Sequence, residues 1–420
     1  MSGAIGDNPY RASGVIAPTA GGGSVAWQAV VTGSTLTAEA GKGYWIDTTS
    51  NICTITLPAS ASEGDQIVFA DYARTWGTYS IVIDSNGLNY QGDDDSYTVE
   101  YETDGQIVHI VYSDATKGWI PNIDEAVEDV PSKGNQNGIF GYGEAPSATG
   151  VTNIVSNTGV VATDVSGVGT ARRSLGACEY GGDKGIFGYG STSGPTVKVA
   201  TTNLVTNAGV VGADVSGVGT ARHYLVACSY GGDKGIFGYG ASPSETAVTN
   251  LVSNTGVVAA DVSGVGTARI NLAACEYGDD KGIFGYGQAS SVSVSMTNLV
   301  SNTGVVGTDV TGVGTGRQKA AACGYGYDKG IFAYGESPSG DHNVSNLVSN
   351  TGVVGTDVTG VGTARRSLTA TQYGGDKGIM AYGETPLYNL SNLVSNAGVV
   401  ASDVTGVGTA RASLAACSFN

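Results

Sequence analysis

Apolar and polar residues alternate with a period of two in the first third of the chain, and no apolar stripe of helical period appears there. The alternation is clearest over residues 53–57, which read Cys-Thr-Ile-Thr-Leu. The pattern predicts strands at residues 44–48, 52–57, 66–72, 80–84, 97–101 and 106–112, closing at 119–120. We therefore expect a small all-β domain, preceded by an extended arm at residues 1–23, which are rich in Gly, Ala and Pro.

The remainder of the chain repeats one motif six times. The sequence Gly-Ile-Phe-Gly-Tyr-Gly, or a close variant, begins at Gly138, Gly185, Gly235, Gly282, Gly330 and Gly378, which gives a period of 47 to 50 residues. That length suits four short strands. In the repeat around Gly185 we expect strands at residues 172–180, 185–190, 202–207 and 209–215, with a hairpin turn at 181–184.

The repeats are out of phase with the ends of the sequence. The first opens in mid-motif at residue 138, and the last stops at residues 413–420, the piece that elsewhere runs directly into the next glycine motif. A ring in which the last strand pairs with the first repeat explains this phase. We predict that residues 411–419 form the first strand of the blade that contains residues 138–143, so that six repeats make six blades.

Two resemblances follow from the repeated residues. Ala-Arg, a few small apolar residues, a tight turn and an apolar strand ending in glycines resemble the kelch repeat, although Gly-Tyr-Gly replaces its double glycine and no Trp follows Trp119. The longer runs DKGIFGYG, TNLVSNTGVV and GVGTAR are similar to the propeller-like repeats of tailed-phage virion proteins. This resemblance implies a six-bladed, kelch-like β-propeller in a virion protein assembled in the host cytoplasm.

The N-terminal region carries a resemblance of its own. The segments 36–48, 56–59, 64–65 and 114–119 look like a β module of phage fibre proteins, which often occurs in trimers. It implies a β-sandwich or prism-like domain, a possible homotrimer, and attachment to other virion or tail proteins. The expected organisation is a virion-attachment arm (1–23), a fibre-type β domain (24–121), an acidic linker (122–134) and the propeller (135–420).

The excess of acidic residues limits which macromolecules the chain can bind. Residues 1–137 hold 18 acidic and 5 basic residues, and the repeats hold 19 and 15. A phosphate backbone would be repelled, so nucleic acid is not an expected partner. The sequence shows neither a signal peptide nor a long apolar run, so we do not expect membrane insertion. Five of the six cysteines recur at one position of the repeat, and we interpret them as small buried apolar residues without disulfides.

Several residues recur in every repeat, and we favour a structural role for them. An Asp and an Arg stand eight residues apart and are expected to join a strand junction or adjacent blades through bidentate hydrogen bonds; the alternative is a ring of arginines for an anionic ligand. The tyrosine of each Gly-Tyr-Gly is expected to pack, with sugar stacking as the alternative. The Asp and Arg pairs are Asp164 and Arg172, Asp214 and Arg222, Asp261 and Arg269, Asp309 and Arg317, Asp357 and Arg365, and Asp403 and Arg411.

Other positions differ between repeats, and these are the candidates for recognition. They form two sets, the loop after the second strand and the two residues after each arginine, which should lie at the same end of every blade. We call this end the variable face. The candidate binding residues on it are Lys198, His223, Tyr224, Glu245, Asn271, Lys319, Asp341, His342, Arg366 and Tyr388.

Catalysis is not expected. The chain has three histidines, no spacing typical of a metal site and no nucleophile-elbow sequence. Asp93-Asp94-Asp95 lacks the alternate spacing of a calcium loop, so we expect a solvated turn, no metal and no cofactor. The leading hypothesis is a tail fibre or receptor-binding adhesin that presents the variable face to a host surface glycan or protein. The alternatives are an architectural head-fibre or decoration protein and, third, a glycan-degrading tailspike.

Overall fold

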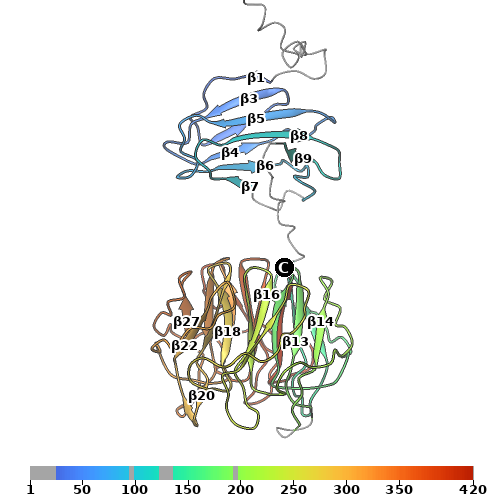
Figure 1. The fold of residues 1–420 in the computed structure, drawn as a ribbon, viewed down its shortest axis with the longest axis vertical. Coiled ribbons are helices and arrows are strands. Elements are labelled where there is room, and N and C mark those ends of the chain that lie inside the picture. Colours follow the sequence, from blue (N-terminus) through green and yellow to red (C-terminus); the bar gives the residue numbers. More distant parts are fainter. Residues whose placement is uncertain (1–24, 94–98, 123–135, 193–196, 420) are drawn as a thin grey trace, which may run out of the picture. The chain divides into compact units, whose positions relative to one another are not determined.

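The computed structural model describes residues 25–93, 99–122, 136–192 and 197–419. Every regular element within them is a β-strand, so the all-β class is confirmed. The chain divides into two compact units, residues 1–133 and 134–420, here called the N-terminal and C-terminal domains (Figure 1). The predicted arm, nearly all of the predicted linker, and Asp94 and Asp95 lie outside the described residues.

Two sheets make up the N-terminal domain. One has the order β1-β3-β5-β8-β9 and the other β2-β4-β6-β7. Their bounds are β1 (Ala26–Trp27), β2 (Thr35–Thr37), β3 (Lys42–Ile46), β4 (Cys53–Thr56), β5 (Gln66–Asp71), β6 (Ile81–Asp84), β7 (Val99–Tyr101), β8 (Ile107–Tyr112) and β9 (Trp119–Pro121). The predicted strands are confirmed to within two residues, while β1 and β2 were missed because they are very short.

The strands β1 to β6 alternate between the two sheets, and this produces parallel neighbours in each sheet. β3 pairs in parallel with β1 and β5, and β4 pairs in parallel with β2 and β6. Both sheets contribute to one core, in which Ile46 and Phe69 of the first sheet and Ile55 and Ile83 of the second are buried. The period-two pattern therefore reports one buried face on each strand.

The C-terminal domain contains six three-stranded antiparallel sheets, one for each repeat. We number them one to six along the chain, starting with the sheet that contains β10. The inner strands are β31 (Ala415–Phe419), β12 (Gly176–Tyr180), β15 (Val226–Tyr230), β18 (Ala273–Tyr277), β23 (Ala321–Tyr325) and β28 (Thr369–Tyr373). The middle strands are β10 (Asn137–Gly141), β13 (Lys184–Gly188), β16 (Lys234–Gly238), β19 (Lys281–Gly285), β24 (Lys329–Ala333) and β29 (Lys377–Ala381).

The outer strands complete the sheets. They are β11 (Thr152–Val155), β14 (Thr202–Val205), β17 (Thr249–Val252), β22 (Thr297–Val300), β27 (Ser345–Val348) and β30 (Ser391–Val394). Two small hairpins stand apart from the sheets: β20 (Gln288–Ala289) with β21 (Val292–Ser293), and β25 (Glu336–Ser337) with β26 (Gly340–Asp341).

The prediction of a fourth strand in each repeat was wrong. The segment at 209–215 meets the outer strand only through two isolated bridges, Thr202 with Val215 and Val205 with Val211. Between these bridges the buried side chain of Asn203 donates to the Gly212 carbonyl at 3.0 Å and to the Asp214 carboxylate at 2.9 Å. A side-chain amide thus replaces the continuous backbone ladder that a strand requires.

Sheet one joins the two ends of the repeat array. β31 pairs with β10 in antiparallel register, with Ile139 opposite Cys417. The inner strands contact one another in the order β31, β12, β15, β18, β23, β28 and back to β31. Phe140 of sheet one also packs edge-on against Tyr382 of sheet six, with ring centroids 5.3 Å apart. The predicted pairing of the C-terminal strand with the first repeat is therefore confirmed.

Cysteine and glycine pack between neighbouring sheets. The sulfur of Cys178 in sheet two lies directly over Gly235 in sheet three, where a Cβ atom would overlap it. The same contact recurs around the domain, and sheet six supplies Thr371 over Gly138 instead. All six cysteines are buried free thiols. Glycine recurs at this place because only a residue without a side chain lets the sheets approach this closely.

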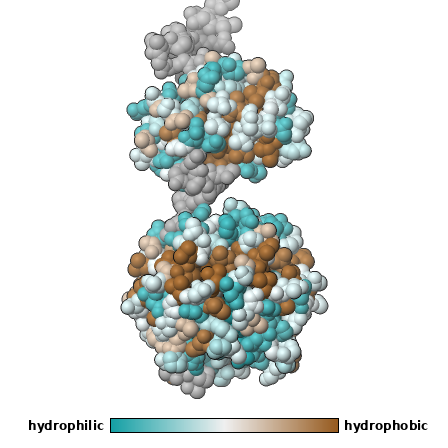
Figure 2. Space-filling model, turned by 180° about the vertical axis from the view of Figure 1, so that it is seen from behind, coloured by the Kyte–Doolittle hydropathy of each residue, from teal (hydrophilic) through white to brown (hydrophobic). Residues whose placement is uncertain are grey.

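Valines line the outer segments of the repeats and remain exposed. Val160, Val210, Val257, Val305, Val353 and Val399 are each at least 61% exposed. A second set, which includes Val165 and Val310, is about half exposed. Figure 2 shows apolar surface gathered in a band across this domain. Apolar surface repeated in this way is typical of a contact region.

Deleting residues 412–420 is expected to unfold the whole C-terminal domain, because it removes β31 and exposes both faces that β31 joins. The measurement is a thermal melt of the truncated chain against the full chain, followed by circular dichroism. Deleting residues 1–23 is the control and should leave the melting of the C-terminal domain unchanged. A truncated chain that melts like the full chain would contradict closure by β31.

Candidate functional site

The two variable sets lie side by side in every repeat. The first residue after each arginine forms a bridge with the first residue after the glycine motif. These bridges are Ala412 with Glu144, Arg173 with Ser191, His223 with Ala241, Ile270 with Gln288, Gln318 with Glu336, and Arg366 with Glu384. The inner strands begin at this end and the hairpin turns lie at the other, so the variable positions gather at one end of the domain, as the sequence predicts.

A closed ring of backbone hydrogen bonds surrounds the centre of the variable face. It is formed by the second residue after each arginine, whose N–H donates to the carbonyl of its counterpart in the neighbouring repeat at 2.8–3.0 Å. The six residues, here called the mouth ring, are Ser174, Tyr224, Asn271, Lys319, Ser367 and Ser413. All have positive φ, between 52° and 56°. Each residue therefore has a strained backbone conformation, and the inter-repeat hydrogen bond offsets part of that strain.

Below the mouth ring lies a cavity of about 120 Å³. It is lined by the mouth ring and by the first residues of the inner strands, which are mostly alanine and leucine. The backbone of the ring is the same in each repeat, but its side chains include serine, tyrosine, asparagine and lysine. The backbone around the mouth of the cavity is therefore regular, while its side chains differ in size, polarity and charge.

Repeats five and six bring five charged side chains together at the mouth. Arg366 forms ion pairs with Glu336, with Asp341 at 3.5 Å and with Glu384 at 3.2 Å. Lys319 lies 2.9 Å from Glu336 and 3.9 Å from Glu384. Each of these side chains keeps 15–32% of its surface exposed. The cluster can therefore exchange some of its internal bonds for bonds to a polar ligand.

Repeats two and three present basic and aromatic groups instead. The rings of His223 and Tyr224 lie 4.1 Å apart. Burial lowers the pKa of His223 to about 4, with Lys198 and Arg173 as further causes. His223 is therefore a neutral ring at physiological pH. Its Nδ1 atom is buried without a hydrogen-bond partner among the described residues.

The remaining candidates are spread around the face. Asn271 donates to Gln318 at 3.2 Å, and Glu245 accepts from the Ser290 N–H at 2.8 Å. His342 contacts Ser337 at 2.7 Å within its own loop, and Tyr388 donates to the Thr385 carbonyl at 3.0 Å. The structure therefore unites Lys319, Asp341 and Arg366 in one cluster and brings Lys198 near the pair of His223 and Tyr224. Asn271 joins Tyr224 and Lys319 through the backbone of the mouth ring, while Glu245, His342 and Tyr388 make their own contacts within the loops.

The candidate set omitted three glutamates that complete the ion pairs. Glu336 and Glu384 bind Arg366, and Glu144 forms an ion pair with Arg173. All three stand directly after the glycine motif. The sequence gives no sign of their partners, because only the bridge to the residue after each arginine brings the two side chains together.

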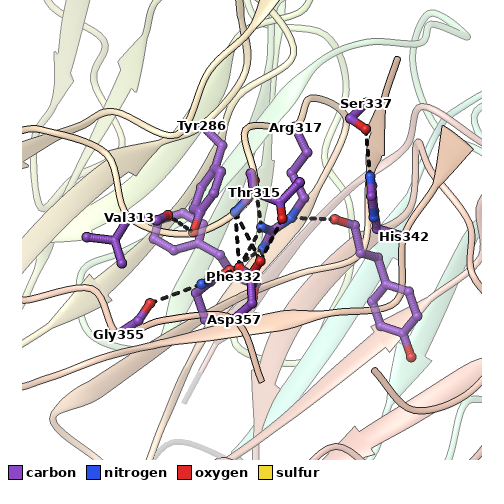
Figure 3. A network of polar contacts seen from close by, with 11 residues as sticks. Tyr286, Val313, Thr315, Arg317, Phe332, Ser337, His342, Gly355 and Asp357 are labelled. Carbon is purple, nitrogen blue, oxygen red and sulfur yellow. Dashed lines mark hydrogen bonds and ion pairs between the residues drawn. The ribbon is translucent and has the colours of Figure 1, made fainter. Parts of the chain in front are cut away.

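The recurring arginines are fully buried, and Figure 3 shows the one in repeat five. Arg317 donates from Nε to the Tyr334 carbonyl at 2.7 Å and from Nη2 to Asn346 at 2.7 Å. Its guanidinium lies 4.2 Å from the ring centroid of Tyr286 in the preceding sheet. One cation therefore joins two sheets and satisfies buried carbonyl and amide oxygens.

Two details of the predicted arginine pairs were wrong. The nearest carboxylate to Arg317 is that of Asp357, which follows the outer strand of the same sheet, not that of Asp309 eight residues earlier. The separation is 3.9 Å, which excludes a bidentate hydrogen bond. Asp357 instead binds the backbone and hydroxyl of Thr315, at 3.1–3.2 Å and 2.6 Å. The arginines point into the sheets, so they do not form a ring for an anionic ligand.

The tyrosines of the glycine motif are fully buried, which rules out the sugar-stacking alternative. Tyr286 packs against Phe332 of the next sheet with ring centroids 5.1 Å apart, and its hydroxyl donates to the Val313 carbonyl at 3.2 Å.

No family model and no curated protein matches this sequence. In the part of the chain that the structure describes, no helix is long and apolar enough to cross a membrane.

Replacing Arg317 with alanine is expected to lower the free energy of unfolding of the C-terminal domain by about 3 kcal/mol, because it leaves buried oxygens without donors. Arg317→Lys should recover only part of this loss, since an ammonium cannot reproduce the planar fork. Urea denaturation measures both. Arg173→Ala is the control: this partly exposed arginine of the variable face should cost about 0.5 kcal/mol or less. Equal losses for Arg317→Ala and Arg173→Ala would refute the structural role.

Stability should also depend on acid through the recurring aspartates. Burial alone would raise the pKa of Asp357, but hydrogen bonds from Thr315 and Asn346 outweigh it and hold the pKa below its usual value of 3.8. The other five aspartates behave alike. A depressed folded-state pKa gives stability that is present above the unfolded pKa and is lost as the pH falls through the folded one.

The urea midpoint should therefore fall steeply below about pH 4. Asp357→Asn should make this fall shallower, while Asp279→Asn, at an exposed turn, should not change it. A midpoint that is independent of pH between 4 and 2 would contradict this account.

Proposed function

We propose that this chain is a phage virion protein, a tail fibre or receptor-binding adhesin, which presents the variable face to a glycan or protein on the host surface. The observation that carries the proposal is that the loops of variable length and the side chains of the mouth ring lie together at one end of a regular array. A constant scaffold with one variable end is typical of recognition proteins.

We further propose that the C-terminal domain is a six-bladed, kelch-like β-propeller. The cyclic order of the inner strands, the β10–β31 pairing and the mouth ring of hydrogen bonds support this architecture. A propeller suits adhesion because its loops surround a rigid central mouth. The N-terminal domain and residues 1–23 would attach the chain to other virion proteins, and several copies in a particle would multiply weak single-site binding.

The band of exposed valines favours a second function, that of an architectural or decoration protein. These valines recur in the outer segment of each repeat, and Figure 2 shows a band of apolar surface across this domain. Apolar surface of this kind would be covered in an assembly. In that case the C-terminal domain would pack within the virion, and the variable face would not contact the host.

Binding of the labelled full chain to host cells and to a glycan array tests the adhesin. Tyr224→Ala should weaken binding at least tenfold, because an aromatic side chain at the centre of a binding face is a typical energetic anchor. Tyr327→Ala is the matched control: this exposed tyrosine lies in a hairpin turn at the opposite end of the domain and should leave binding unchanged.

Exchanging residues 191–201 for the loop of another repeat should change host preference. If the folded wild-type chain does not bind host cells or glycans, the adhesin function is contradicted and the architectural function is favoured. Equal losses in Tyr224→Ala and Tyr327→Ala would refute the assignment of the face.

A further inference from the structure

The inner strands follow one another in a closed order, and the space that they enclose is here called the channel. A second variable position lies on these strands, far from the mouth ring. It is the fourth residue of each inner strand, next to the hairpin turns at the opposite end of the domain. The six residues are Ser418, Glu179, Ser229, Glu276, Gly324 and Gln372. They differ between repeats although their neighbours on either side are nearly constant. These six residues are not part of the variable face.

Oxygen atoms from sheets four and six converge at Gly324 of sheet five. If residue 324 had a Cβ atom, that atom would lie 3.3 Å from Glu276 Oε1 and 3.2 Å from Gln372 Oε1. The missing side chain therefore leaves a space that faces two oxygens. On the other side of the channel, Glu179 accepts a hydrogen bond from the Ser418 hydroxyl at 2.7 Å.

Gln372 supplies an independent sign of a ligand. The residue is 6% exposed, and its Oε1 atom is buried with no hydrogen-bond partner in the described part of the chain. Its Nε2 atom donates to the Gly375 carbonyl at 2.5 Å, which fixes the amide with its oxygen toward Gly324. A buried amide oxygen without a donor is costly and is usually satisfied by water or an ion.

The two glutamates also lack a cation within the described residues. Their electrostatic neighbours are each other, Asp183 and Asp279, and no lysine or arginine acts on either. Two carboxylates that face one channel repel each other and lose hydration. A bound cation would relieve both effects and would satisfy Gln372.

We propose that this cluster binds a divalent calcium ion through Glu179, Glu276 and the amide oxygen of Gln372. Calcium accepts six to eight oxygen ligands in flexible geometry, so hydroxyl groups and waters can complete the shell. Among the described residues, no group of three or more His, Cys, Asp or Glu side chains is arranged to hold a metal ion, so the donors of this site include an amide oxygen. Two carboxylates and one amide supply only oxygen donors, which suit a hard cation such as calcium and do not suit zinc. A calcium ion at this place departs from the sequence expectation of no metal.

Calcium titration of the full chain, first stripped with a chelator, tests the site. Isothermal titration calorimetry should give one bound calcium per chain. The Tm of the C-terminal domain should rise by at least about 4 °C at saturating calcium, because the ion binds only the folded state. Magnesium at the same concentration should give a smaller shift, since it is reluctant to exchange its water for protein ligands.

Three variants make the test specific. Glu276→Gln should abolish the heat of binding and the Tm shift while the chain stays folded, and Gly324→Ala should weaken binding at least tenfold by filling the space. Glu63→Gln, an exposed acid of the N-terminal domain, should behave as the wild type. The proposal is overturned if calcium gives neither heat nor a Tm shift, or if the shift persists unchanged in Glu276→Gln. Neither result depends on receptor binding.

Discussion

The buried arginine of each repeat is the interaction on which the C-terminal domain depends. Arg317 illustrates it: the guanidinium satisfies a carbonyl and an amide oxygen in its own sheet and lies on the tyrosine face of the preceding sheet. All six arginines are fully buried, and each lies on the tyrosine face of the preceding sheet. Their hydrogen bonds differ, since Nε and Nη2 of Arg172 have no hydrogen-bond partner among the described residues. Buried cations without any partner would be costly. Because each one needs groups from two sheets, no sheet is complete alone, and the array must form as a unit.

Closure extends this dependence to the chain ends. β31 completes the sheet of β10, and Arg411 near the C-terminus donates to Tyr142 and Asn153 at the start of the array at 3.0 and 2.6 Å. The mouth ring and the turn contacts add inter-repeat backbone bonds at the two ends, including Gly374 to Gln136 at 2.8 Å. A ring held at both ends and between its sheets leaves the loops free to vary without loss of fold.

That freedom is used at two separated places. The variable face combines an ion-pair cluster around Arg366 with the neutral ring of His223, on side chains that keep contact with solvent. The channel position instead gathers oxygens around Gly324, next to the hairpin turns at the opposite end of the domain. The first arrangement suits recognition of a large polar partner, and the second suits an ion that strengthens the ring.

The sequence by itself determined the all-β class, the strand positions of the N-terminal domain, the period of the repeats and the pairing of the last strand with the first repeat. These follow from local alternation, glycine turns and phase, which are properties of neighbouring residues. Tertiary structure decided that Asn203 replaces a fourth strand, that Arg317 pairs with Asp357 and not Asp309, and that Glu276 and Gln372 meet at Gly324. Asn203 contacts residues 9 to 11 positions later, whereas the other two contacts join residues about 40 to 100 positions apart. Burial selects these contacts from partners that look equivalent in sequence.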